Sequence, residues 1–242
     1  MGVAPQICRP ADNQPNQSSG SLGDMLRASR WARALDPEQL QRVERAIVQR
    51  HCPAGGFVCR KGEAVEHWIG VIDGLVKMTN LSAAGKPTTF TGIPSGGWFG
   101  EGSLLKDEPR RYDIVALRDS RIAYMPRATF MWLLDNNIGF NRFLLHQLNE
   151  RLGQFIAMVE HDRLLGPDAR VAHCLAAMFN PYLYPGIGPQ LEISQEEIGY
   201  LAGLSRQRVN RSLKALEKAG LLRVEYGGIT VIDLPGLRSF SA

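Results

Sequence analysis

A narrow apolar stripe in the middle of the chain constrains its fold more than any other feature. The stripe consists of Ile138, Leu145, Leu148, Leu152, Phe155 and Val159. From Leu145 onward the spacing alternates between three and four residues, which is the repeat of a coiled-coil seam. We therefore predict one long helix over about residues 139–165, ended by the Gly166–Pro167 break.

This helix is predicted to carry a dimer interface. Most positions between the apolar residues are polar, so only one narrow face is suited to burial. We expect a homodimer whose interface is formed by Leu145, Leu148, Leu152, Phe155 and Val159. The alternative is that the helix packs its stripe on the β domain of its own chain. We assign residues 136–165 to this dimerisation helix.

Glycines punctuate the preceding segment, from about residue 51 to residue 125. Between them lie short β-prone runs such as HWIGVIDGLVKM, TTFTGI, DIVAL and RIAYM. Many short strands separated by regular turns are typical of a small all-β barrel or sandwich. We predict a β domain over residues 24–135 with short flanking helices. Residues 1–23, which include the polar run ADNQPNQSSGSLG, are expected to be a disordered extension.

Composition and motifs exclude several classes of protein. The formal net charge is only +4, and no run approaches the ~18 apolar residues of a membrane span, so we expect a cytoplasmic protein without membrane contact. The cysteines are Cys8, Cys52, Cys59 and Cys174. They form no CxxC pair, so we expect reduced thiols and no metal site. No nucleophile elbow, His-Glu-x-x-His motif or P-loop is present, which argues against an enzyme.

The segment ISQEEIGYLAGLSRQRVNRSLKALEKAGLL, residues 193–222, resolves into two helices. Ser194 and Glu197 have the spacing of a capping box, so the first helix should begin there. Gly203 permits a tight turn because glycine tolerates positive φ. Ser205 is then placed to cap the second helix. This order of elements predicts a helix-turn-helix.

The second helix has one apolar face and one basic face. At about 100° per residue, Val209, Leu213 and Leu216 lie opposite a polar arc. Between residues 205 and 223, six basic side chains stand against one acidic side chain. A basic face of this kind is the layout of a recognition helix that enters the DNA major groove. The predicted DNA-contacting residues are Ser205, Arg206, Gln207, Arg208, Asn210, Arg211 and Lys214.

These contacts are expected to divide between bases and phosphates. Arginine pairs bidentately with guanine, and glutamine or asparagine with adenine, whereas Arg208 and Lys214 flank the arc and are expected to meet phosphates. Two β-prone runs around Gly227–Gly228 predict a hairpin after the helix. Helix-turn-helix and hairpin together predict a winged helix over residues 166–242, with double-stranded DNA as its partner.

From about Gly55 to Ile232 the chain resembles the catabolite-activator (CRP/FNR) family of bacterial transcription regulators. The residues that carry the resemblance are ISQEEIGYLAGLSRQRVNRSLKALEKAGLL and FGEGSLLKDEPRR, residues 99–111. The resemblance implies an α+β fold with an N-terminal cyclic-nucleotide-binding-like β-roll (jelly-roll), a long dimerisation helix and a C-terminal winged helix-turn-helix. It also implies a palindromic DNA site and contact with RNA polymerase. Gln207 replaces the family's usual glutamate, so the identity of the base that it contacts is left open.

The resemblance implies an effector site in the β-roll. Phe99-Gly100-Glu101 matches the start of the family's phosphate-binding cassette, and Arg111 lies ten residues beyond Glu101. In cyclic-nucleotide binders the glutamate holds the ribose hydroxyl and the arginine holds the phosphate. The expected effector-binding residues are Gly100, Glu101, Gly102, Arg110, Arg111, Tyr112, Phe155 and Ile156.

Several departures leave the effector unknown. Tyr112 replaces the small hydroxyl residue after the arginine, and Phe155 and Ile156 replace the hydroxyl residues that contact adenine in the family. A different small ligand is therefore favoured over cAMP. Two further alternatives stay open, namely that the site holds no ligand and that the protein binds haem. Two alternatives to a ligand-controlled regulator are a cyclic-nucleotide-type module without a DNA-binding role in gene regulation, and a ligand-independent DNA binder.

Overall fold

The computed structural model describes residues 8–10, 20–81, 87–185 and 187–241. The chain divides into two compact units, each of which is considered by itself. One comprises residues 1–149 and 182–185, and the other comprises residues 150–181 and 186–242. The division falls inside the long helix. The first unit is called the β-roll unit and the second the winged-helix unit.

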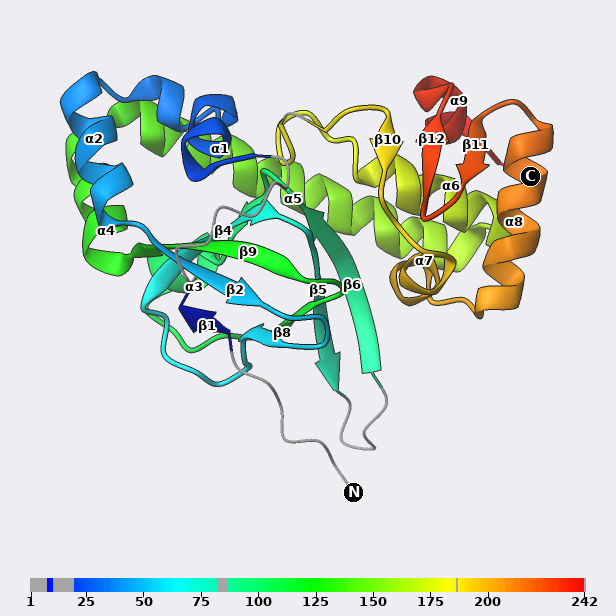
Figure 1. Ribbon diagram of the computed structural model, residues 1–242, viewed down its shortest axis with the longest axis horizontal. Coiled ribbons are helices and arrows are strands. Elements are labelled where there is room, and N and C mark those ends of the chain that lie inside the picture. Colours follow the sequence, from blue (N-terminus) through cyan, green and yellow to red (C-terminus); the bar gives the residue numbers. More distant parts are fainter. Residues whose placement is uncertain (1–7, 11–19, 82–86, 186, 242) are drawn as a thin grey trace. The chain divides into compact units, whose positions relative to one another are not determined.

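The β-roll unit contains two antiparallel sheets, as the glycine-punctuated texture predicts (Figure 1). The five-stranded sheet has the order β1 (Arg9–Pro10), β2 (Val48–Cys52), β9 (Ser120–Pro126), β4 (His67–Asp73) and β7 (Trp98–Phe99). The four-stranded sheet has the order β3 (Phe57–Cys59), β8 (Asp113–Ala116), β5 (Leu75–Leu81) and β6 (Pro87–Pro94). Every pairing within them is antiparallel. The β-roll thus closes through hairpins and longer crossovers.

Strands and helices together bring aromatic residues into the core of this unit. The helical elements are α1 (Leu22–Ala28), η1 (Ala32–Ala34), α2 (Pro37–Ala46), α3 (Glu101–Lys106) and α4 (Arg127–Asn136). Trp68 of β4 is fully buried, and its ring centroid lies 4.5 Å from that of Trp98 and 5.6 Å from that of Phe140. Trp31, Phe130 and Phe143 also contact Trp68. Burying a ring of this size stabilises the fold by roughly 3 kcal/mol.

The N-terminal segment corrects two sequence predictions. Residues 9–10 form β1, which pairs with β2, and Cys8 and Cys52 form a disulfide. The predicted extension is therefore wrong for residues 8–10, and its other parts, residues 1–7 and 11–19, lie outside the described residues. The prediction that all cysteines are reduced is also wrong, although Cys59 and Cys174 are free. A partner 44 residues away is set by strand pairing, which cysteine spacing does not reveal.

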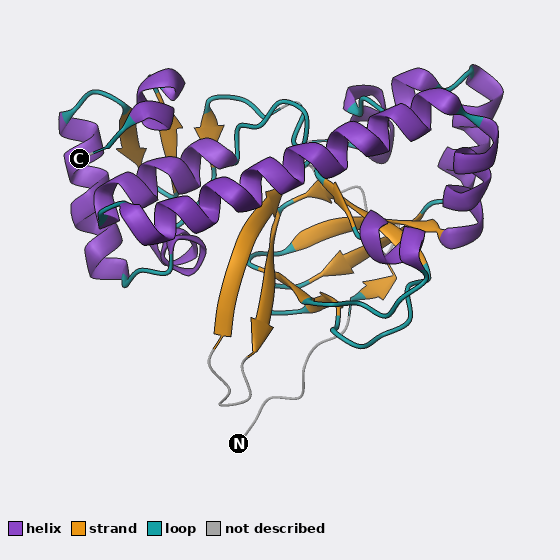
Figure 2. Cartoon of the chain, turned by 180° about the vertical axis from the view of Figure 1, so that it is seen from behind, coloured by secondary structure: helices purple, strands orange, loops and turns teal. Residues whose placement is uncertain are grey.

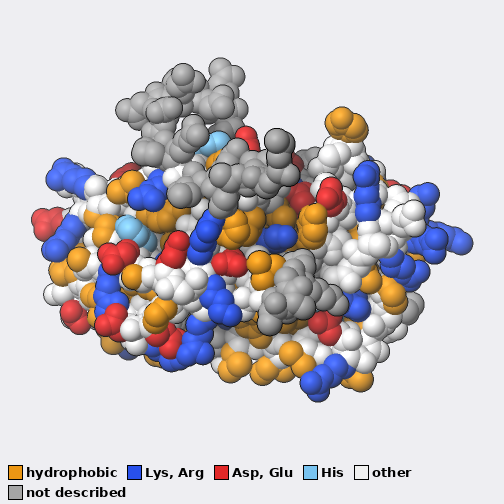
Figure 3. All heavy atoms as spheres, turned by 90° about the horizontal axis from the view of Figure 1, so that it is seen from below, with side chains coloured by type: hydrophobic (Ala, Val, Ile, Leu, Met, Phe, Trp, Pro, Cys, Tyr) orange, Lys and Arg blue, Asp and Glu red, His pale blue; other side chains and the backbone are white. Residues whose placement is uncertain are grey.

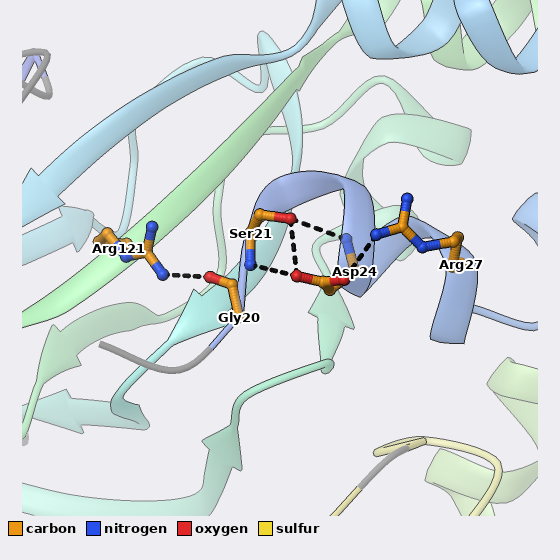
Figure 4. A network of polar contacts seen from close by, with 5 residues as sticks. All are labelled: Gly20, Ser21, Asp24, Arg27 and Arg121. Carbon is orange, nitrogen blue, oxygen red and sulfur yellow. Dashed lines mark hydrogen bonds and ion pairs between the residues drawn. The ribbon is translucent and has the colours of Figure 1, made fainter. Parts of the chain in front are cut away.

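The end of the predicted extension is ordered as well (Figure 4). Ser21 caps α1, since its Oγ accepts the backbone N–H of Asp24 at 3.1 Å, while the Asp24 carboxylate accepts the backbone N–H of Ser21 at 2.9 Å. Arg27 donates to the same carboxylate, and Arg121 of β9 donates to the carbonyl of Gly20. These contacts fix the entry of the chain into α1.

The long helix is α5 (Ile138–Leu164), which runs without interruption as the apolar stripe predicts (Figure 2). Asn137 precedes it, and its Oδ1 accepts the backbone N–H of Phe140 at 2.8 Å. The predicted seam is partly uncovered. Leu145, Leu152 and Val159 expose 69%, 58% and 47% of their surfaces. These three residues are seven positions apart and follow one face of the helix.

The winged-helix unit contains the predicted helix-turn-helix and the predicted hairpin. After the Gly166–Pro167 break come α6 (Pro167–Ala177), α7 (Gln195–Ala202), α8 (Arg206–Lys218) and α9 (Leu234–Ser239). A three-stranded antiparallel sheet has the order β10 (Gln190–Leu191), β12 (Gly228–Val231) and β11 (Leu222–Glu225). Helix α8 packs on both α6 and α7.

Candidate functional site

The helix-turn-helix forms because each local signal agrees with the next. Ser194 caps α7, with its Oγ accepting from the N–H of Glu197 at 3.2 Å and the Glu197 carboxylate accepting from the N–H of Ser194 at 2.5 Å. Gly203 has a φ of +65°, which glycine adopts without the steric cost of a side chain. Ser205 then caps α8 by accepting from the N–H of Arg208 at 3.3 Å. The predicted motif is confirmed at these positions.

Helix α8 separates its apolar and basic faces. Val209, Leu213 and Leu216 are at most 1% exposed. The opposite face is open to solvent and carries Arg206, Gln207, Arg211 and Lys214, with Asn210 half-buried. Lys and Arg side chains gather on the surface over α8 (Figure 3). The helix therefore presents hydrogen-bond donors outward while its other face anchors it, as a DNA-reading helix requires.

Arg208 takes a different position from the one predicted. Its Nη2 lies 2.8 Å from a carboxylate oxygen of Asp168 on α6, and the Oγ of Ser212 donates to the same oxygen at 2.6 Å. This guanidinium is engaged inside the unit, with a partner that the helical period does not predict. Asn210 also has a partner, donating from Nδ2 to Gln195 at 3.2 Å. Both contacts hold α8 against its neighbouring helices.

The wing turns one residue earlier than the glycine pair predicts. Glu225 pairs with Gly228, so Tyr226 and Gly227 form the loop, with a φ of +79° at Gly227. A Cβ at Gly228 would lie 2.5 Å from the carbonyl oxygen of Leu191, because β10 packs closely on β12 there. The second glycine of the pair is thus required by strand packing rather than by the turn.

The cassette of the β-roll brings a buried carboxylate and a buried guanidinium into one region. Glu101 and Arg110 are 2% and 4% exposed. The indole N–H of Trp68 donates to Glu101 at 3.4 Å, and the Nη2 of Arg110 donates to the carbonyl oxygen of His67 at 2.7 Å. The Nη1 of Arg110 is buried without a hydrogen-bond partner among the described residues. An unpaired buried guanidinium nitrogen is suited to an anionic oxygen.

Gly100 makes room for this guanidinium. Its φ is +93°, and a Cβ there would lie 2.2 Å from the Nη1 of Arg110. A Cβ at Gly102, in contrast, would meet nothing within 4 Å. Gly100 is therefore needed for both its backbone conformation and the close approach of Arg110, whereas Gly102 leaves open space.

Arg111 is exposed, unlike its neighbour Arg110. It lies on the surface and makes a bidentate ion pair with Glu108, at 2.8 and 2.7 Å. Hydrogen bonding to Arg111 lowers the pKa of the Glu108 carboxyl to about 2. The buried arginine of this segment is Arg110, one residue before Arg111.

The effector role of the remaining residues stays a prediction. Tyr112 is half-buried beside Arg111 in sequence. Phe155 and Ile156 belong to the winged-helix unit, so their effector role stays a prediction. Among the described residues, no three His, Cys, Asp or Glu side chains are grouped as metal ligands. None of the described helices is both long enough and apolar enough to cross a bilayer.

Two protein-family models match the chain in the order that the fold suggests. The Cyclic nucleotide-binding domain matches residues 49–137, and the Crp-like helix-turn-helix domain matches residues 169–240. The two matches coincide with the β-roll strands and with the α6 to α9 region.

Relatives match across both units. The chain is 30% identical over 190 residues to the cAMP-activated global transcriptional regulator CRP of Pasteurella multocida, covering 75% of this chain and 90% of the relative. It is 28% identical over 208 residues to the Cyclic AMP receptor protein of Thermus thermophilus, covering 85% and 94%. The structure of FixK2 from Bradyrhizobium japonicum has a TM-score of 0.64 at 21% identity, covering 81% of this chain and 98% of that chain.

Both sequence relatives carry the name of a regulator or receptor and neither that of an enzyme. The β-roll with its Glu101 and Arg110 cassette, the long helix and the winged helix occur together in one chain, and relatives match it over nearly their full length. The chain belongs to the CRP/FNR family of effector-controlled, DNA-binding transcription regulators.

Proposed function

We propose that the chain binds a palindromic DNA site as a homodimer and that an anionic small molecule in the β-roll controls this binding. The observation that carries the proposal is the division of α8 into a buried apolar face and an exposed basic face. Solvent exposure alone does not require four polar or basic side chains on one arc of a capped helix, whereas base reading in a major groove does.

Three side chains on α8 are proposed to read bases. Arg206 and Arg211 are exposed and long enough for bidentate pairing with guanine O6 and N7. Gln207 lies beside Arg206 and both donates and accepts hydrogen bonds, so it suits adenine. Lys214, farther along the helix, supplies a phosphate contact that sets register rather than sequence. Arg208 is left out of this set because Asp168 holds it.

The second part of the proposal is the dimer. Leu145, Leu152, Ile156 and Val159 expose 47–69% of their surfaces along α5. A stripe of this kind on one helix is stabilised by pairing with the same stripe on a second copy. A two-fold dimer would place two α8 helices at half-sites about 34 Å apart, one turn of the duplex. The proposal also includes contact with RNA polymerase, by resemblance to the family.

The third part is the effector. Arg110 would hold an anionic group through its unpaired Nη1, and Glu101 would accept from a hydroxyl of the ligand. The sequence relatives are named for cAMP, and a structural relative from Xanthomonas campestris is named as c-di-GMP responsive, so this fold serves more than one nucleotide. The ligand acts by binding the DNA-competent state more tightly than the other.

The test is fluorescence anisotropy of a family-type palindromic duplex titrated with the purified protein, with and without cAMP. Tight binding that is weakened by Arg211→Ala supports the DNA part of the proposal. A gain in affinity with cAMP that is lost in Arg110→Met assigns the effector role to Arg110. If cAMP changes nothing, the same titration with c-di-GMP decides whether another nucleotide fills the site. Absence of sequence-specific binding would overturn the proposal.

A further inference from the structure

A four-residue segment between α6 and β10 belongs to the β-roll unit. Both flanking elements lie in the winged-helix unit, whereas Tyr182–Pro185 is part of the β-roll unit. Connecting segments usually run over the surface of a protein, where water satisfies their backbone groups. Here Leu183 and Tyr184 are only 2% and 1% exposed. We call residues 182–185 the strap, because the chain leaves the winged-helix unit before them and returns to it after them.

Two tyrosines anchor the strap. The ring of Tyr182 stacks on that of Phe143 on α5, with 5.6 Å between the centroids and 13° between the planes. The hydroxyl of Tyr182 donates to the carbonyl oxygen of Phe143 at 3.3 Å, and the guanidinium of Arg30 lies 4.9 Å from the centroid of the tyrosine ring. The hydroxyl of Tyr184 donates to the carbonyl oxygen of Gly92 on β6 at 3.3 Å. Both anchors therefore combine ring packing with a hydrogen-bonded hydroxyl, which fixes their orientation.

Two glycines of the β-roll make room for the strap. Gly96 has a φ of +84°, and a Cβ there would lie 2.7 Å from the carbonyl oxygen of Pro185. A Cβ at Gly97 would lie 3.0 Å from the ring of Tyr184. The turn that holds these glycines is itself fixed, since the N–H of Gly96 donates to the carbonyl oxygen of Val71 at 2.8 Å. The strap thus fits against a turn whose residues leave space for it.

This turn is continuous in sequence with the effector cassette. Gly97 leads directly into β7, and β7 leads directly into Gly100 and Glu101. Strand β7 pairs with β4, whose Trp68 donates to Glu101 at 3.4 Å. A strand of two residues spans roughly 7 Å. Because packed elements switch between discrete arrangements rather than deform gradually, a displacement of the cassette is expected to displace the turn as well.

We propose that the strap positions the winged-helix unit for DNA binding and that the effector cassette controls its docking through β7. This inference rests on the proposed function and names the device that regulates it. With the strap docked, two connections restrain the winged-helix unit, α5 and the strap, instead of α5 alone. Restraint before association lowers the entropy that binding costs. A palindromic site gains most from it, because both α8 helices of the dimer must be spaced for two half-sites at once.

The experiment compares variants on two duplexes. A site is first selected in vitro with the wild-type protein, and it is then prepared as the full palindrome and as a single half-site. Tyr184→Leu keeps an apolar side chain but removes the ring and the hydroxyl that anchor the strap. We expect it to weaken binding to the palindrome about tenfold and to leave binding to the single half-site unchanged. Tyr182→Ala, at a half-buried position, should act in the same direction.

Two controls separate positioning from other causes of weaker binding. Leu133→Ala removes part of a fully buried side chain on α4 of the same unit, outside the strap and its turn, and should bind both duplexes normally. Arg211→Ala removes a proposed base contact, so it should weaken binding to both duplexes. Equal losses on the two duplexes, or no loss in Tyr184→Leu and Tyr182→Ala, would overturn the positioning role.

Hydrogen exchange tests the link between the strap and the cassette. Coupling between two sites is reciprocal, so DNA must favour docking of the strap if docking favours DNA binding. We expect the palindrome to slow amide exchange in wild-type protein at the strap and at β7, and to leave exchange at β2 unchanged. No change at the strap or at β7 would overturn the inference. If no site is enriched, or if Arg211→Ala binds the palindrome as tightly as the wild type, the proposed DNA-binding function itself has failed.

Discussion

Arg208 and Arg211 are three residues apart on α8, yet they have different partners. Arg208 is paired with Asp168, while Arg211 extends into solvent. We expect Arg208→Ala to lower the free energy of unfolding by about 1 kcal/mol, because it breaks a half-buried ion pair. We expect Arg211→Ala to leave stability unchanged and to cost about 1–3 kcal/mol of specific DNA affinity. Thermal unfolding and anisotropy measured on both variants check this, and equal effects on DNA binding would contradict it.

The cassette glycines offer a matched pair of substitutions. Gly100→Ala places a Cβ against Arg110 at a φ of +93°, so we expect a loss of about 1–3 kcal/mol of stability. Gly102→Ala adds a Cβ in open space within α3, where alanine favours the helix over glycine by about 1 kcal/mol. Thermal melts of the two variants should therefore shift in opposite directions. A neutral Gly100→Ala would show that Arg110 is free to move.

The sequence predicts the position of a residue well where helical periodicity alone determines it. It does not predict a contact with a residue that is distant in sequence. The arc of Arg206, Gln207 and Arg211 follows from helical period alone, and it is exposed as expected. The ion pair of Arg208 is not visible in the helical period, because its partner lies 40 residues away in sequence. The sequence places both Arg110 and Arg111 in the candidate effector site, because residue spacing alone does not show which of two adjacent arginines is buried.

Helix α5 is the element whose role depends on a second copy. Leu152 is 58% exposed, so Leu152→Asp should leave the protomer folded. In the proposed dimer it would bury two unpaired carboxylates, which is strongly destabilising. We expect the variant to sediment as a monomer at micromolar concentration, while the wild type is a dimer. Leu105→Asp on α3, a position 42% exposed, is the control and should remain dimeric.

The junction of α5 and α6 contains two histidine rings in close, tilted contact. The rings of His161 and His173 lie 4.0 Å apart between centroids, and the Nε2 of His173 lies 3.0 Å from the carbonyl oxygen of Phe240. Burial, and then the neighbouring His173, lower the pKa of His161 below 6.5, although Glu160 and Asp162 act in the opposite direction. The unfolded chain therefore binds more protons than the folded chain as pH falls through this range.

The stability of the winged-helix unit should consequently decrease as pH drops from about 7.5 to about 5. We expect its Tm to fall over this range in the wild type and to fall less in His161→Gln. His51→Gln, on β2 of the other unit, should keep the full dependence. A melting temperature that rises on acidification would contradict the assigned direction of the pKa shift.

At the scale of the whole molecule, the order of the parts was readable from changes in hydrophobic period. Three patterns appear in the sequence in the same order as the folded elements. They are β-prone runs separated by glycines, an apolar stripe with coiled-coil spacing, and a pair of capped helices. The division of the chain inside α5 was not readable, because a continuous helix shows no break in its own pattern. The pairing of β1 with β2 was not readable either, since a two-residue strand has no period.

The Cys8–Cys52 disulfide joins this short strand to the β-roll and closes a long stretch of chain. Two residues of strand pairing contribute little on their own, so the covalent link dominates the attachment of the N-terminal segment. Closing a loop of this length restricts the unfolded chain and stabilises the folded one by about 2–4 kcal/mol. We expect a phosphine reductant to lower the Tm of the wild-type protein, and Cys8→Ser to melt at that lower temperature with or without reductant. Cys174→Ser, which changes a free cysteine in the other unit, should keep its sensitivity to the reductant. A wild-type Tm that does not respond to reductant would show that the link contributes nothing to stability.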